Sequence, residues 1–596
     1  MQIYYNINKS IWRRKMDYIK TKFYDDVDRS CPLNEYPRPQ MVRSAWQNLN
    51  GEFSYALGNS LDTAPASFDG KILVPFAYES QLSGVCKQLK PNEILWYSKM
   101  FTVDETIANE RILLHFEAVD WQCKVYVNGS LVVEHIGGYL PFAADITDVL
   151  KDGENELRVA VYDPTDEGWQ QRGKQTLESH GFWYTATSGI WQTVWLEGVS
   201  ATHIEKIKLL PDIDKDQLKI DLSLVGVCDR IVAQVLDGEN VLLEKEIAES
   251  DVLALSDYEL WSPENPKLYD LRLTAYCGDK AVDTVMSYFG MRKFSVQTVD
   301  GLPRLSLNNK PYFQNGLLDQ GYWCDGGLTA PTDEAMIYDI AKMKELGFNM
   351  LRKHIKIEPA RWYYHCDRLG MLVWQDMVSG GKFIGQLLAG VLPNLSISVK
   401  DNKYKAFSRE KPEWRANFEE ELHGMIDALY NHVSICCWVP FNEGWGQFDA
   451  YRIGHEVKQY DPSRFVDHAS GWHDQHGPDF KSIHRYIVPV TLPLRDGRPF
   501  VLSEFGGYSR IIDGHVWNKK KSFGYIMFNS EKMLSKAYRI LFKTQIIPLI
   551  KKGLCATVYT QVSDVEFEVN GILTYDRKLV KLDENMLKEI NAQMHY

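Results

Sequence analysis

Two glutamates stand where buried-looking runs of sequence end, and together they have the chemistry to cleave a glycosidic bond. Glu443 closes the apolar run "SICCWVPF" in "VPFNEGWGQF", and Glu504 closes another in "VLSEFGG". Glycoside cleavage uses two carboxyl groups around one point: one protonates the leaving oxygen, and the other attacks the anomeric carbon or activates water. One such glutamate is ordinarily a solvated loop acid. Two of them, each ending a buried run, indicate a site.

The pattern of apolar runs after about residue 296 predicts which elements bring these acids together. Eight apolar runs alternate with helical patterns, which is typical of a (β/α)8 barrel with its site at the C-terminal strand ends. "WRANFEEELHGMIDALYNH" predicts a helix with one apolar face. Helices after the fifth and sixth strands are hard to discern, and residues 378–413 resemble an insertion after the third. The runs are "PYFQNGLL", "NMLRKHIK", "MLVWQDM", "SICCWVPFNE", "RFVDHASGW", "SIHRYIV", "FVLSEFGG" and "ATVYTQVSD".

Other polar and aromatic side chains occur at the ends of the same runs, where a barrel would gather them around the two acids. Arg352, at the end of the second run, is placed to keep Glu504 ionised, because a nearby cation favours the charged carboxylate. Asp376 ends the third run and has the chemistry to bind sugar hydroxyls. For the aromatic residues, packing inside the barrel is an equally good interpretation. The predicted substrate-binding set also contains His354, Trp374, Trp472, His484, Tyr486, Tyr559 and Gln561.

The first half of the chain has the pattern of β-structure. Short β-branched runs such as "RILLHF" and "CKVYVNG" alternate with turn residues, which favours a jelly-roll sandwich. The next hundred residues repeat this style and suit one immunoglobulin-like sandwich. We therefore predict four parts: an N-terminal arm (1–26), a jelly roll (27–200), an immunoglobulin-like β-sandwich (201–295) and a TIM barrel (296–596).

Composition and charge exclude some classes of binding partner. The net charge of -12 argues against nucleic acid and against an anionic membrane. The ten cysteines lack metal-ligand spacing, and Cys436-Cys437 lies inside an apolar run, so we expect buried thiols. The first twenty residues include no apolar signal core, and no stretch is long and apolar enough to span a bilayer, so we expect a cytoplasmic protein. We predict neither a metal nor a cofactor.

The chain resembles glycoside hydrolase family 2, the β-galactosidase and β-glucuronidase family, from about residue 36 to about residue 580. "NHVSICCWVPFNEGWGQFD" is similar to its acid/base signature and "VLSEFGG" to its nucleophile strand; "GFWYTATSGIWQTVWLE" and "LWSPENPKLYDLRL" are similar to its β-modules. The resemblance implies a retaining enzyme with Glu443 as acid/base and Glu504 as nucleophile. It also implies that Asn442 contacts the sugar 2-hydroxyl and that Tyr486 hydrogen-bonds the nucleophile. In the family, a histidine follows the arginine that Arg352 matches. His354 corresponds to that histidine, but it lies one residue closer to the arginine than usual.

The loop after the eighth strand bears on the identity of the sugar. Family glucuronidases hold the sugar carboxylate there with Asn-x-Lys, whereas this chain has Glu568-Val569-Asn570. An acid would repel a carboxylate, so neutral sugars are favoured, β-galactosides first. Glucuronides, arabinopyranosides and mannosides remain alternatives. So do a carbohydrate-binding protein without catalysis and a barrel enzyme whose acids hold a metal. The β-domains of this family often make oligomer contacts, which leaves a homo-oligomer open.

Overall fold

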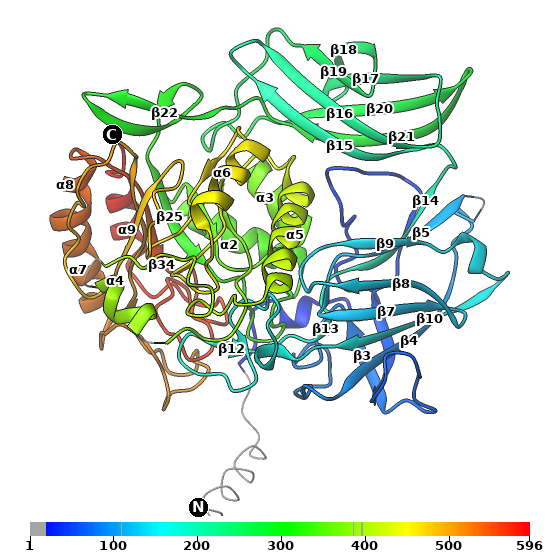
Figure 1. Cartoon of the computed structure of the whole chain (residues 1–596), viewed down its shortest axis with the longest axis horizontal. Helices are drawn as coiled ribbons and strands as arrows, with labels where there is room; N and C mark the ends of the chain where they lie inside the picture. The colour runs from blue at the N-terminus through cyan, green and yellow to red at the C-terminus, as the bar shows by residue number, and fades with distance from the viewer. Residues whose placement is uncertain (1–18, 109, 386, 395–396) are drawn as a thin grey trace, which may run out of the picture.

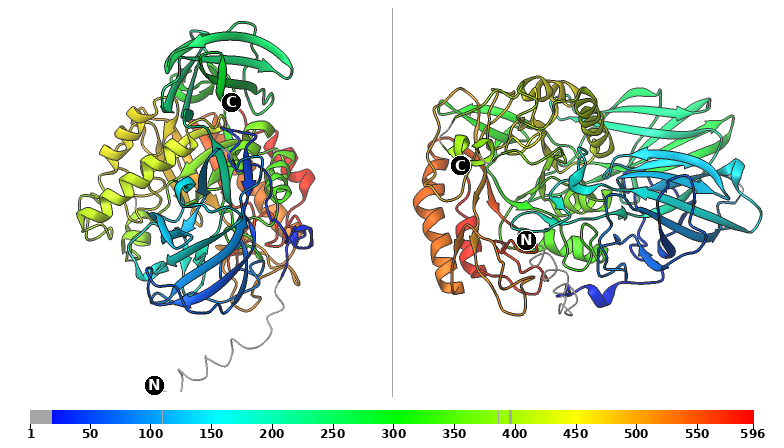
Figure 2. Two further views of the ribbon diagram at one scale, coloured as in Figure 1. Left: turned by 90° about the vertical axis from the view of Figure 1, so that its right-hand side faces the viewer. Right: turned by 60° about the horizontal axis from the view of Figure 1, so that its bottom comes forward.

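The structure is a computed structural model that describes residues 19–108, 110–385, 387–394 and 397–596. Most of the predicted N-terminal arm (1–26) therefore lies outside the described residues. Figure 1 shows three parts: a β-domain at the lower right, a β-sandwich at the top and a barrel with its helices at the left. The sandwich also lies above the other two parts when the molecule is turned about the vertical axis (Figure 2, left).

The jelly roll consists of two antiparallel sheets that share one core. Every second side chain of β7 is buried, which is the alternation of a strand with one solvent-facing side. The first sheet has the spatial order β3 (Gly70–Val74), β2 (Gly51–Gly58), β4 (Ile94–Thr102), β10 (Glu154–Tyr162), β7 (Gln122–Val127), β8 (Ser130–Ile136). The second sheet has the order β1 (Trp46–Asn48), β14 (Val194–Val199), β5 (Arg111–Phe116), β9 (Phe142–Asp145).

The immunoglobulin-like domain is likewise a sandwich of two antiparallel sheets. Its core includes Leu218 and Ile220 from one sheet and Ala233 and Leu271 from the other. One sheet has the order β15 (His203–Asp212), β16 (Gln217–Val225), β19 (Ser250–Ala254). The other has the order β18 (Asn240–Ile247), β17 (Arg230–Asp237), β20 (Tyr269–Cys277), β21 (Lys280–Phe289).

The third part is the predicted TIM barrel, an eight-stranded parallel sheet that curls on itself. Each strand overlaps one of the eight apolar runs, so the strand prediction is confirmed. Cys436 and Cys437 are buried free thiols in this sheet, as expected. The spatial order is β29 (Phe465–Val466), β28 (Ile435–Val439), β27 (Leu372–Asp376), β26 (Met350–Lys353), β25 (Gln314–Asp319), β34 (Leu554–Thr560), β31 (Phe500–Gly506), β30 (Lys481–Arg485).

The barrel helices follow most, but not all, of the strands. The predicted apolar face of α5 is buried, including Phe418, Leu422 and Met425. Within the described ranges, no helix separates β29 from β30 or β30 from β31, and none has the length and apolarity to cross a membrane. The helices are α2 (Asp333–Glu345), α3 (Ala360–Leu369), α4 (Leu392–Asn394), α5 (Pro412–Leu429), α6 (Ala450–Tyr460), α7 (Glu531–Leu541), α8 (Ile547–Ile550) and α9 (Glu584–Asn591).

A small sheet closes the barrel at the N-terminal ends of its strands. Leu305 and Leu307 belong to the same buried cluster as Val501 and Cys555, near the starts of β31 and β34. The opposite, C-terminal end is therefore the end open to a ligand. The strands of the small sheet are β22 (Phe294–Val299), β23 (Leu302–Leu307) and β24 (Lys310–Pro311).

A loop of the jelly roll crosses to that open end, carrying the short strands β11 (Gln175–Thr176) and β12 (Tyr184–Thr185). In Figure 1, β12 lies beside the barrel rather than with the jelly-roll sheets. Arg172 Nη1 donates to the backbone oxygen of Gly381 at 2.7 Å, and Gln171 Nε2 donates to Glu421 Oε1 at 3.0 Å. These bonds tie the loop to the barrel helix α5 and to the segment between β27 and α5.

Candidate active site

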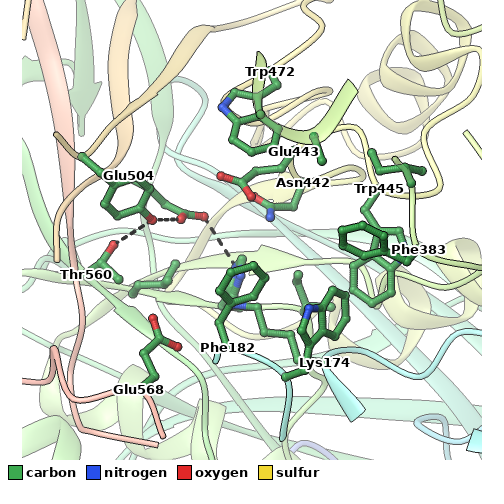
Figure 3. A pocket seen from close by; sticks show the side chains of 18 of the residues that line it. Lys174, Phe182, Phe383, Asn442, Glu443, Trp445, Trp472, Glu504, Thr560 and Glu568 are labelled. Atoms are coloured by element: carbon green, nitrogen blue, oxygen red, sulfur yellow. Dashed lines mark hydrogen bonds and ion pairs between the residues drawn. The ribbon is translucent and has the colours of Figure 1, made fainter. Parts of the chain in front are cut away.

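Glu443 and Glu504 come from distant segments and lie at one cavity at the mouth of the barrel (Figure 3). Glu504 is in β31. Glu443 follows β28 in a turn with φ of +52°, and its backbone N–H donates to the Ser470 oxygen at 3.0 Å. Residues other than glycine rarely adopt this left-handed conformation, and such strain concentrates at functional sites.

The two carboxylates are close enough to act on one atom. One oxygen of each and a ring nitrogen of His484 all lie within 4.8 Å of one another. His484 Nδ1 is 2.7 Å from Glu443 Oε1, and His484 Nε2 is 3.6 Å from Glu504 Oε1. Retaining glycosidases hold their carboxyl groups roughly 5–5.5 Å apart, and inverting ones about 6.5–9.5 Å apart. The observed separation fits the retaining arrangement.

The surroundings of Glu504 favour its ionised form. Burial raises the pKa of Glu504, but His484, His354 and Arg352 more than offset this effect, and the pKa is lowered to about 2. Arg352 Nη1 donates to Glu504 Oε1 at 3.1 Å. The Tyr486 hydroxyl donates to Oε2. Burial, and then the charge of Glu504, raise the pKa of Tyr486, so this hydroxyl keeps the proton that it donates.

Arg352 also organises the residues around Glu504. Its guanidinium is fully buried and forms a two-pronged ion pair with Asp376, at 2.9 and 3.0 Å. The same guanidinium donates from Nη2 to Asn442 Oδ1 at 2.9 Å. Because its oxygen is engaged, Asn442 has its amide NH2 left to donate to a ligand.

Asp376 holds a second predicted residue, His354, through a contact of 2.7 Å to His354 Nδ1. Burial, with smaller contributions led by the charge of Lys174, keeps the pKa of His354 well below its usual range. The ring is therefore neutral at neutral pH, where it acts as a hydrogen-bonding group and the cation that favours ionised Glu504 is Arg352. Asp376 thus serves to position Arg352 and His354 rather than to touch the cavity.

The cavity has a volume of about 380 Å³ and is walled by three parts of the chain. The barrel strand ends supply the acids, the segment between β27 and α5 supplies apolar side chains, and the jelly-roll loop supplies a lysine and two aromatic residues. Of the residues predicted from sequence, the lining includes His354, Asn442, Glu443, Trp472, Tyr486 and Glu504.

Three predicted contacts with substrate are corrected by the structure, since these side chains do not line the cavity. Trp374 points into the barrel interior, where it is fully buried and its Nε1 donates to Gln314 Oε1 at 2.6 Å. Tyr559 is buried in a core cluster, where its ring packs against Tyr538 of α7 and against Phe542. Gln561 is fully buried, and its amide NH2 donates to Asn570 Oδ1 at 2.8 Å. In the sequence, a buried strand position looks the same whether its side chain faces the barrel interior, the surrounding helices or the mouth.

Arg352, Asp376 and His484 also do not line the cavity, but each contacts a residue that does: Arg352 contacts Glu504, Asp376 contacts His354 and His484 contacts Glu443. Arg352 and His484 touch the two acids directly. These three side chains therefore position the reacting groups.

Sequence reasoning missed the contributions from outside the strand ends. The ring of Trp183 packs on that of Trp445 with centroids 4.8 Å apart, and Phe383 lies 6.0 Å from Trp183. Tyr525 stacks on Tyr486 with centroids 4.0 Å apart. In the sequence, the aromatic cluster "GFWY" (181–184) was the one sign of such a wall. The missed lining residues include Lys174, Phe182, Trp183, Phe383, Trp445, Tyr525 and Thr560.

Two groups of described residues have donor atoms close enough together to hold a cation. One is Glu443, His484 and Glu504 themselves. The other is Asp474, His476 and Asp496, where Arg498 already pairs with both aspartates at 2.6 Å. The second group is therefore neutralised by protein, and the first coincides with the acid pair.

Comparisons with solved structures agree with this architecture. The β-D-glucuronidase of Dictyoglomus thermophilum matches with a TM-score of 0.74 at 17% identity, covering 94% of this chain and 99% of that one. A β-glucuronidase of Ruminococcus gnavus also gives 0.74 at 17% identity, over 94% and 98%. At 17% identity, the similarity is evidence about the fold alone.

A multidomain barrel with paired carboxylates at its mouth is the architecture of a glycoside hydrolase, and family models name the family. They match the family 2 sugar-binding domain over residues 85–199, a further family 2 domain over 202–292 and the family 2 TIM barrel over 303–489. The chain belongs to glycoside hydrolase family 2.

The relatives found by sequence carry two kinds of name. A β-galactosidase of Clostridium acetobutylicum is 26% identical over 70% of this chain and 49% of its own length. A putative β-glucuronidase of Formosa agariphila is 25% identical over 70% of this chain and 51% of its own. The chain thus spans about half the length of these curated relatives.

Proposed function

We propose that the chain is a retaining exo-β-glycosidase that releases terminal β-linked sugars through a covalent glycosyl-enzyme. One observation carries the proposal: a carboxylate oxygen of Glu443 and one of Glu504 lie within 4.8 Å of each other at one cavity. That spacing suits direct attack by one carboxylate while the other delivers a proton.

In the first step, a Glu504 oxygen forms a bond to the anomeric carbon as the bond to the leaving oxygen breaks. Glu443 passes its proton to that oxygen. The lowered pKa of Glu504, about 2, keeps it ionised and ready to attack at neutral pH. The Asn442 amide, oriented by Arg352, is placed to hold the sugar 2-hydroxyl.

In the second step, the Glu443 carboxylate takes a proton from water, and the water oxygen displaces Glu504 from the anomeric carbon. The side chain of Glu443 is 27% exposed, against 5% for Glu504, so water has access to the base. The 2.7 Å contact with His484 Nδ1 holds the carboxyl group in place through both proton transfers.

For the sugar, we propose a neutral one, with β-galactosides first. Glu568 lines the cavity and is only 2% exposed, so a uronate carboxylate would meet a buried acid. Relatives named β-galactosidase agree with this choice. β-Glucuronides are the second candidate, because a relative and several structural neighbours are named for that sugar. The cytoplasmic location and a homo-oligomer stay predictions.

A 2-deoxy-2-fluoro aryl β-galactoside tests the proposal, because the fluorine slows the second step and lets the glycosyl-enzyme accumulate. We expect one added sugar by intact mass, located on the peptide that contains Glu504. An unlabelled protein that nevertheless turns over aryl glycosides would contradict the double displacement.

Two rival functions give different results. A binding protein without catalysis would bind galactose but turn over none of a panel of aryl β-glycosides. An enzyme whose acids hold a metal at Glu443, His484 and Glu504 would lose activity to a chelator, whereas the proposed mechanism predicts full activity after chelation.

A further inference from the structure

A lysine from the jelly roll faces the reacting acids. Lys174 directly precedes β11, lines the cavity together with Glu504 and His354, and is half-buried. Its Nζ lies 5.8 Å from the ring centre of Phe182 and 5.9 Å from that of Tyr184. Among the residues that the structure describes, no carboxylate oxygen lies within 4.0 Å of this nitrogen. The ammonium group is therefore available to a ligand.

The backbone at Lys174 is held against the barrel. Gly173 has φ of +63°, and a Cβ there would lie 2.9 Å from the backbone oxygen of Ile355, just after β26. The N–H of Tyr184 donates to the Lys174 oxygen at 2.9 Å. A cation fixed in this way is positioned by the fold rather than carried on a free loop.

An acid of the barrel lies in the wall of the same cavity. Glu568 accepts from Asn570 Nδ2 at 2.9 Å through Oε1, and from the Tyr184 hydroxyl through Oε2. Tyr184 is thus common to both charges: its ring lies near Lys174 and its hydroxyl holds Glu568. Lys174 and Glu568 do not pair with each other, since no ion pair within 4.0 Å joins them in the described part of the chain.

We propose that Lys174 and Glu568 are the specificity-determining residues of the site. Lys174 donates to hydroxyl groups of the terminal sugar and Glu568 accepts from them, on the ring edge away from the scissile bond. This inference rests on the proposed function and names its substrate class: a neutral, hydroxylated sugar rather than a uronate.

The chemistry follows from the two unpaired charges. A hydroxyl group is both donor and acceptor, so neighbouring hydroxyls can satisfy an ammonium and a carboxylate at once, through charge-assisted bonds that are stronger than neutral ones. A carboxylate in the same place would pair with Lys174 but would meet the buried negative charge of Glu568. The pair therefore favours hydroxyls, and Glu568 supplies the discrimination against an acid.

Variants of the full chain test the two roles. We would measure kcat and KM for 4-nitrophenyl β-galactoside and β-glucuronide with Lys174→Met and Glu568→Gln. Loss of one hydrogen bond to a charged group lowers kcat/KM by about 10- to 100-fold. We expect that loss on the galactoside for both variants, mostly in KM, and a glucuronide-to-galactoside ratio raised at least about 10-fold in Glu568→Gln.

Matched controls separate recognition from folding. Lys382→Met removes an exposed lysine that directly precedes the lining residue Phe383 and does not itself line the cavity, and Glu566→Gln changes a buried glutamate of the same loop as Glu568. Both should keep the wild-type KM. Melting temperatures of all four variants show whether any loss reflects unfolding.

Calorimetry of galactose binding tests this inference separately from the proposed function, because binding can be measured without turnover. If wild type binds galactose and Lys174→Met and Glu568→Gln bind it at least about 10-fold more weakly, the inference stands even if no glycoside is turned over. Unchanged galactose affinity and KM in both folded variants would overturn it. So would a Lys174→Met variant that loses only glucuronide turnover, because Lys174 would then be a carboxylate anchor.

Discussion

The two walls of the cavity are built differently. On the barrel wall, Glu504 and Arg352 are almost fully buried, and each polar atom of Arg352 that faces the site has a partner. On the opposite wall, formed by the jelly-roll loop and the segment between β27 and α5, aromatic and apolar side chains dominate. Phe383 is 57% exposed and Val391 52%.

This difference indicates a division of labour. Groups that form and break bonds need fixed positions and controlled ionisation, which a buried network on rigid strands supplies. Groups that select a ligand need contact area and unpaired polar atoms, which a loop from another domain supplies. Substitutions in the buried network of Glu504 and Arg352 should therefore change kcat, and those at Glu568 and on the other wall should change KM.

The largest effect is expected for Glu504→Gln. An amide cannot attack the anomeric carbon, so we expect kcat to fall by at least about 10⁴-fold with galactose binding retained. Steady-state kinetics and calorimetry check this, with Glu456→Gln on the exposed side of α6 as the control. Wild-type-like rates would refute the assignment of the nucleophile.

Glu443→Gln should show an effect that depends on the leaving group. We expect a loss of about 10²- to 10⁴-fold for alkyl β-galactosides, which need a proton on the departing oxygen. The first step on 2,4-dinitrophenyl β-galactoside should stay within about 10-fold of wild type, because that group departs without a proton. Pre-steady-state release of dinitrophenol measures this step. Equal losses on both substrates would contradict the assignment of Glu443 as the general acid.

Arg352→Met tests how the barrel wall controls ionisation. Without this cation the pKa of Glu504 should rise, so the acidic limb of the kcat/KM profile should move up by about 1 to 3 pH units. Asp376 would also lose its buried partner, and we expect unfolding free energy to fall by about 3–5 kcal/mol. A pH–rate profile and denaturant titration measure the two effects. An unmoved acidic limb in a folded variant would show that Arg352 does not tune the nucleophile.

Trp183→Ala tests the opposite wall and should have the smallest effect. This ring packs between Trp445 and Phe383, so its loss should raise KM for aryl β-galactosides by about 10-fold through lost aromatic contact. The kcat should change by less than about twofold. Phe182→Ala is a second, independent test of the same wall. A fall in kcat with unchanged KM would break the proposed division between the walls.

The same division explains what the sequence could predict. The barrel, its eight strands and the acid pair follow from local patterns: apolar runs, their spacing and the polar residues that end them. Trp374 and Tyr559 fit the same patterns, yet Trp374 is packed among buried side chains and Tyr559 packs against Tyr538 of α7. Successive residues of a barrel strand face opposite sides of the wall, so the pattern alone does not say which of them reach the mouth.

Lys174 and Trp183 were not predictable in this way. They lie more than a hundred residues before the first barrel strand, in a loop whose sequence carries no sign of its docking partner. Their place depends on tertiary contacts such as Arg172 to Gly381 and the approach of Gly173 to Ile355. Glu568 was visible as a departure from a family motif, but its link to Tyr184 was not.

The spacing of the two carboxylates is the central claim, and the anomeric form of the first product tests it most directly. Proton NMR during rapid hydrolysis of an aryl β-galactoside should show β-galactose appearing first, with the α form growing only through mutarotation. First appearance of α-galactose would mean that water attacks directly, and it would contradict Glu504 as a nucleophile held within 4.8 Å of Glu443.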